Sequence, residues 1–165
     1  MEGSAPFDSH SKPQVKYVLI IALLASLSSG LAADKKTLTP EQQTAAQVEE
    51  LKQKIARDSE REVCIHSAEL IHVLVEQFAS QMNAGQLEPA QQTLNDIGTY
   101  ADKAREAAKN KHHKLKQAEL MLHKSSRRLG DIGESLAVEN RPAIMAIVKR
   151  IEAADDEILN QVFKD

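Results

Sequence analysis

A seven-residue repeat of apolar side chains runs from position 94 to position 136, and no proline interrupts it. Its members are Leu94, Ala101, Ala108, Leu115, Leu122, Leu129 and Leu136. Such a repeat is typical of one long helix packed lengthwise against other helices. Aromatic residues make up only 3% of the chain and Trp is absent, so the core must be aliphatic. We therefore expect an all-α fold with coiled-coil-like packing.

The first 32 residues have the pattern of a secretory signal peptide. Lys12 and Lys16 precede an apolar run over Tyr17–Leu27, and Gly30 and Ala32 supply the small residues that signal peptidase requires. We expect cleavage after Ala32 and no stable membrane insertion afterwards. The alternative is an uncleaved membrane anchor, although the apolar run is short for a hydrocarbon core of about 30 Å. The expected location is secreted or periplasmic, in a bacterial envelope.

A polar linker over 33–38 leads into a single helical domain over 39–165. Thr39 and Gln42 have the spacing of a capping box, and Pro40 suits the first helical position. No Pro or Gly follows until Gly85, which predicts a first helix over 39–84. Within it, the polar stretch Asp58–Glu62 contains a second capping-box match and predicts an internal turn.

Gly85 has the residue type preferred for ending a helix, and Pro89 suits the start of the next. The short connection makes the two helices antiparallel neighbours. The repeat predicts that the second helix continues over 89–137, and a three-four apolar stripe predicts a shorter third helix over 141–163. The expected architecture is a long antiparallel helical hairpin with this third helix along part of it.

The third helix is too short to cover the end of that hairpin, which contains the most apolar part of the mature chain. We expect an interaction surface there, formed by Val63, Leu70, Leu74, Phe78 and Met82. A second copy of the chain, giving a homodimer, or a protein client would cover it. The alternative is a break between Asn110 and Lys114 that folds the chain into a compact four-helix bundle.

Composition and motifs point away from several function classes. The formal net charge is −3 and export is expected, so we expect no nucleic-acid partner. Cys64 is the only cysteine, which excludes an internal disulfide and suits a small buried side chain. An intermolecular disulfide or a reactive thiol is the alternative. The chain has no nucleophile, phosphate-loop or Cys-x-x-Cys motif, so we expect neither an enzyme nor a cofactor.

A metal site is the remaining chemical hypothesis. Glu62 and His66 lie four residues apart on one helical face, and His112 or His113 could approach them across the hairpin. Zinc requires three or four such ligands in tetrahedral geometry. Histidines flanked by lysines are usually solvated, so we expect no metal at these four residues.

The segment Leu38-Thr39-Pro40-Glu41-Gln42 resembles the Leu-Thr-x-x-Gln signature of exported helical proteins of the Spy/CpxP type. That resemblance implies a helical, cradle-like dimer that acts as an envelope stress chaperone or in a metal response. The residues themselves favour a non-catalytic structural or protein-interaction module of the cell envelope. A holdase-like chaperone or metal-responsive protein is the alternative.

Overall fold

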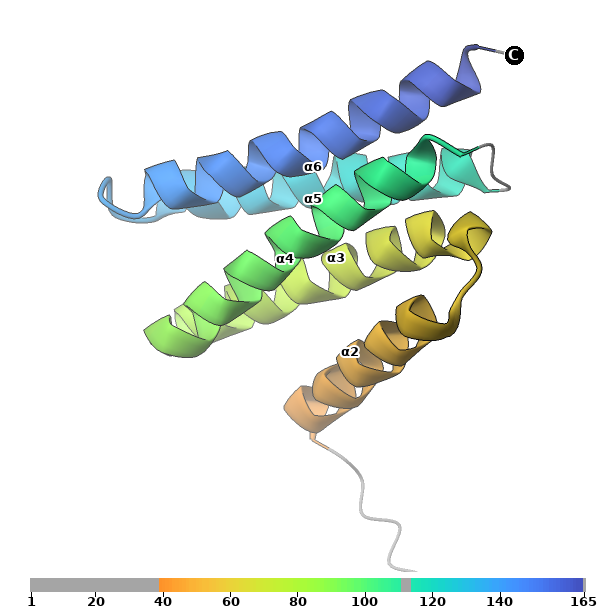
Figure 1. Ribbon diagram of the computed structural model, residues 1–165. Coiled ribbons are helices and arrows are strands. Elements are labelled where there is room, and N and C mark those ends of the chain that lie inside the picture. The colour runs from red at the N-terminus through yellow and green to blue at the C-terminus, as the bar shows by residue number, and fades with distance from the viewer. Residues whose placement is uncertain (1–38, 111–113, 165) are drawn as a thin grey trace, which may run out of the picture. The chain divides into compact units, whose positions relative to one another are not determined.

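The computed structural model describes residues 39–110 and 114–164, and all regular structure in these ranges is α-helical (Figure 1). The prediction of an all-α fold is thus confirmed. The helices are α2 (Pro40–Arg57), α3 (Glu60–Asn83), α4 (Leu87–Ala108), α5 (Leu115–Ser135) and α6 (Arg141–Val162). The predicted signal peptide and linker, within residues 1–38, lie outside the described residues.

Two antiparallel hairpins, α3–α4 and α5–α6, pack on each other and form a four-helix bundle (Figure 1). Helix α3 also packs against α5, and α4 packs against α6, so each of the four helices has two principal neighbours. In the first hairpin Gly85 adopts the left-handed φ of 71°, which confirms its predicted place after the helix. Helices α3 and α5 run in one direction, and α4 and α6 run in the other.

The bundle core is aliphatic, as the composition predicts. Its large side chains with less than 2% exposure come from all four helices and include Leu70, Ile71, Ile97, Leu122, Leu129, Ile151 and Ile158. Alanines fill the level where α4 approaches its neighbours most closely, because Ala101, Ala104 and Ala108 are fully buried. Small side chains at these positions let the helix backbones come together.

The prediction of one continuous helix over 89–137 is wrong. Helix α4 ends at Ala108 and α5 begins at Leu115, after Lys114 with a φ of 70°. The alternative, a break between Asn110 and Lys114, is the arrangement found. Burial is the physical reason, since the turn folds α5 and α6 back over the apolar side of the first hairpin. Ala108 and Leu115 both remain buried, so the repeat continues across the break.

The other predicted helix boundaries agree more closely with the structure. The chain leaves the helix after Arg57 and resumes at Glu60, which confirms the polar turn and divides the predicted helix over 39–84 into two. Helix α6 covers almost exactly the predicted range of the third helix. Asn140 precedes it, but the Asn140 side chain makes no capping hydrogen bond.

Two glycines lie where helices approach closely. A Cβ placed on Gly98 of α4 would lie 2.8 Å from Cδ1 of Ile147 and would also collide with the Arg150 guanidinium. On Gly133 of α5, a Cβ would lie 3.0 Å from Cγ2 of Ile144. Gly98 therefore leaves room for the Ile147 and Arg150 side chains of α6, and Gly133 leaves room for the Ile144 side chain.

Candidate interaction surface around helix α2

Helix α2 begins with the predicted capping box. The Gln42 N–H donates to Thr39 Oγ1 over 3.3 Å, and the Thr39 N–H donates to Gln42 Oε1 over 3.1 Å. Pro40 occupies the first helical turn, where no amide donor is needed. Local sequence alone thus specifies where α2 starts.

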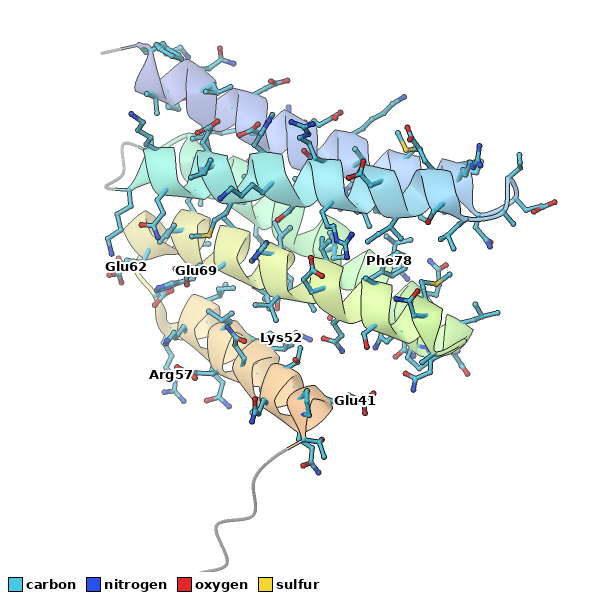
Figure 2. The ribbon with its side chains drawn as sticks, turned by 180° about the vertical axis from the view of Figure 1, so that it is seen from behind. Glu41, Lys52, Arg57, Glu62, Glu69 and Phe78 are labelled. Atoms are coloured by element: carbon cyan, nitrogen blue, oxygen red, sulfur yellow. The ribbon has the colours of Figure 1, made fainter. Side chains whose placement is uncertain are left out.

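Helix α2 lies outside the four-helix bundle and packs mainly against α3 (Figure 2). Only Val48, Leu51 and Ile55 of its 18 residues are buried. By comparison, nine residues of α4 and eight of α5 are buried. The other four helices complete a ring of contacts without α2. Helix α2 is therefore an additional helix, attached to the bundle through a narrow apolar stripe.

One ion pair supplements that stripe. Lys52 of α2 donates to the Asp96 carboxylate of α4 over 2.8 Å, with both side chains partly exposed. The hydrogen bond from Lys52 to Asp96 raises the pKa of Lys52, although partial burial acts in the opposite direction. An exposed pair of this kind adds little stability, but it fixes the direction in which α2 lies.

The connection between α2 and α3 consists of Asp58 and Ser59, which both have extended backbone angles. The Asp58 N–H donates to the Lys54 carbonyl over 2.8 Å and completes the last turn of α2. The Ser59 side chain makes no capping hydrogen bond to α3. His66 Nδ1 instead contacts the Asp58 carboxylate across the turn, and both side chains are mostly buried.

Two hollows flank the part of α2 that carries Ala45, and a third, of about 300 Å³, lies between α2, α3 and Met121 of α5. Of the first two, one, of about 340 Å³, lies between the first half of α2 and the second half of α3, and the other, of about 250 Å³, lies between α2, α3 and α4. Ala45, Gln77 and Gln81 line both. The side-chain oxygens of Gln77 and Gln81 are buried and lack a hydrogen-bond partner within the described part of the chain. An unpaired buried acceptor costs about 1–3 kcal/mol, so these two oxygens weaken the packing of the first half of α2 on α3.

The predicted interaction residues lie mainly in the core, and Leu74 also lines the hollow between α2, α3 and α4. Leu70, Leu74 and Phe78 are at most 2% exposed, and Val63 and Met82 are half-buried against the same core. The uncovered hairpin end on which this prediction depended does not occur, because after the break α5 packs on α3 and α6 packs on α4. The chain itself therefore supplies the cover that was expected from a second copy or a client.

The structure describes two of the four metal candidates, Glu62 and His66. Glu62 is exposed at the start of α3 (Figure 2), and His66 is engaged by Asp58. His112 and His113 lie outside the described residues. Among residues 39–110 and 114–164, no group of three or more His, Cys, Asp or Glu side chains has a geometry suited to a metal ion.

Sequence reasoning missed a buried carboxylate between α5 and α6. Asp155 is 7% exposed, its Oδ1 has no hydrogen-bond partner in the described ranges, and its Oδ2 lies 3.6 Å from His123 Nδ1. Burial, and then the like charge of Glu119, raise the pKa of Asp155 to about 6, against a smaller opposing effect of His123. The spacing of Glu119 and His123 on one helical face was the available signal, but it does not show which residue of α6 lies opposite.

Cys64 is buried in the core with 1% exposure. Burial raises the pKa of its thiol to about 12. The thiol is therefore neutral at physiological pH, and Cys64 is the small buried side chain that the sequence predicts.

Comparisons of sequence and fold find no matching protein family, curated protein or solved structure. Within the described ranges, none of the helices combines the length and the apolar character needed to cross a bilayer. The residues of the chain are thus the basis for any functional assignment.

Proposed function

We propose that this chain is an exported, non-catalytic helical module that binds other polypeptides through the side carrying α2. The observation that carries the proposal is the position of α2 as a fifth helix on a bundle that is closed without it. The described residues of the other four helices bury their apolar stripes in one core, whereas α2 buries three side chains and is flanked by hollows. We infer export from the signal-peptide pattern of the first 32 residues.

The surface around α2 has the chemistry of a protein-binding surface. Its hollows are lined by amide, carboxylate and methyl groups. Protein interfaces combine apolar contact with hydrogen bonds in this way.

Site-specific photo-cross-linking tests the binding surface. A photoreactive residue replaces Ala45, which lines both hollows, and a matched control replaces Glu152, which is exposed on α6. We expect polypeptide adducts at position 45 and few at position 152. Equal labelling at the two positions, or none at either, would overturn the proposal.

Two further measurements test location and the alternative function. The exported protein should have the mass of a chain starting at Ala33, and an intact amino terminus would favour the membrane anchor. A holdase of the Spy/CpxP type would suppress aggregation of an unfolded client such as reduced α-lactalbumin. The interaction module that we propose leaves client aggregation unchanged.

A further inference from the structure

We propose that α2 exchanges between two copies of this chain, with the Asp58–Ser59 turn as the hinge. In the exchanged form α2 and α3 become one continuous helix over 40–83, and α2 docks on α3 and α4 of the second copy. This inference deepens the proposed function, on which it rests for the choice of surface, by naming a second copy of the chain as a partner.

The hinge contains no residue that prevents helix formation. From Glu41 to Ala84 the sequence has neither Pro nor Gly, and only Asp58 and Ser59 interrupt the helical backbone. Their φ values, −66° and −65°, already suit a helix, so only ψ must change from about 151° and 152°. The Asp58 N–H already makes the helical bond to Lys54.

Few interactions hold the hinge in its turned form. Ser59 does not cap α3 with its side chain, so a stabilisation common at helix starts is missing. Among the side chains that the structure describes, His66 and Asp58 make a contact that closes the turn. Short hinges of this kind favour the exchange of an element between identical chains.

The surface that α2 would leave is suited to another α2. The stripe of Val48, Leu51 and Ile55 would bury the same area in the second copy, and Lys52 would meet the Asp96 carboxylate of that copy. Because these contacts are the same within and between chains, exchange changes the free energy chiefly at the hinge and through association. The buried, unpaired oxygens of Gln77 and Gln81 reduce the stability of the docked form and so favour release of α2.

Two variants at the hinge should favour opposite forms, one the turned hinge and the other the continuous helix of the exchanged dimer. Ser59→Pro fits the turn, because its φ of −65° suits proline and Asp58 before it has an extended ψ of 151°. Proline within a continuous helix is strongly unfavourable. The double variant Asp58→Ala, Ser59→Ala removes the contact with His66 and places good helix formers at both positions.

Sedimentation velocity of the chain from Ala33 onward, over a range of concentrations, measures the result. We expect the dimer fraction to rise from Ser59→Pro through the wild type to the double alanine variant. Ser59→Pro should weaken dimerisation by about 100-fold or more, because both chains of a dimer contain the hinge. The same dimer fraction in all three proteins, each with unchanged helical circular dichroism, would overturn the exchange.

Cross-linking of mixed isotopes distinguishes exchange from any other dimer. Dimers assembled from ¹⁴N and ¹⁵N chains are treated with a carbodiimide, which joins Lys52 to Asp96 at their contact distance of 2.8 Å. Exchange gives cross-linked peptides that carry one label from each chain. Peptides with a single label only would overturn exchange and leave the photo-cross-linking result, and hence the proposed function, unaffected.

Discussion

Gly98 of α4 lies directly against Ile147 of α6, so closely that a Cβ on the glycine would come within 2.8 Å of the isoleucine Cδ1. Gly98→Ala would also displace Arg150, which is bonded to Asp102 on α4. We expect this substitution to lower the free energy of unfolding by about 1 kcal/mol or more, since overpacking outweighs the gain in helix propensity. Chemical denaturation followed by circular dichroism measures the change.

Gly130→Ala is the matched control on α5, because a Cβ there meets nothing within 4 Å. It should raise the free energy of unfolding by up to about 1 kcal/mol, the usual advantage of Ala over Gly in a helix. Equal effects of the two substitutions would contradict the close approach of α4 and α6.

The pH dependence of stability should identify Asp155. Its pKa of about 6 lies above the ordinary 3.8, so between these values the folded state holds a proton that the unfolded state releases. The free energy of unfolding contributed by Asp155 therefore falls as pH rises from about 4 to about 6, and it stays low above that range. Asp155→Asn should abolish this slope and stabilise the protein at pH 7.

Glu152→Gln provides the comparison, because Glu152 is an exposed carboxylate on the same helix. Urea denaturation of the wild type and both variants from pH 4 to pH 8 gives the three curves. Parallel curves for the wild type and Asp155→Asn would show that Asp155 ionises normally in the folded state.

Cys64 should report opening of the core. With 1% exposure and a thiol pKa of about 12, it should react with a maleimide at least about 100-fold more slowly in the native protein than in guanidinium chloride. Ser80→Cys in a Cys64→Ser background gives an exposed thiol for reference. Native labelling of Cys64 as fast as that of this reference would be incompatible with its burial.

Two leucines on α5 test the predicted orientation of that helix. Leu122 is fully buried, whereas Leu120 is 50% exposed. Leu122→Ala should cost about 2–5 kcal/mol of unfolding free energy, and Leu120→Ala should cost much less. Thermal denaturation measures the loss of stability in both variants. A larger loss for Leu120→Ala than for Leu122→Ala would show that α5 turns its other face to the core.

Local signals predicted the helix ends well, because the groups that form them are close in sequence. Thr39 and Gln42 are three residues apart, and Gly85 needs only its own backbone freedom. The course of the chain after Ala108 could not be predicted in the same way. An apolar repeat continues equally well through a long helix and through a turn that preserves its spacing, and only the burial gained by folding back decides between them. The positions three residues after each member of the repeat are mostly small or apolar, and the charged Lys111 among them was a visible sign of a break.

The candidate surface was harder to predict for the same reason. The apolar richness around Leu70 and Leu74 correctly indicated extensive contact, but the partner proved to be the second half of the same chain. Ion pairs between helices, such as the 3.2 Å contact of Arg128 with Glu76 of α3, could not be predicted without the register of the helices. That α2 lies outside the bundle becomes clear only from the packing of the other four helices.

The division of the bundle into two hairpins, each continuous in sequence, also affects how the chain folds. Contacts within a hairpin close short loops, so α3–α4 can form while α5 and α6 are still being synthesised. Until they arrive, Phe78, which lines a hollow together with Ala143 and Ile144 of α6, lacks part of its later cover, and the nascent chain exposes apolar surface that the finished protein conceals.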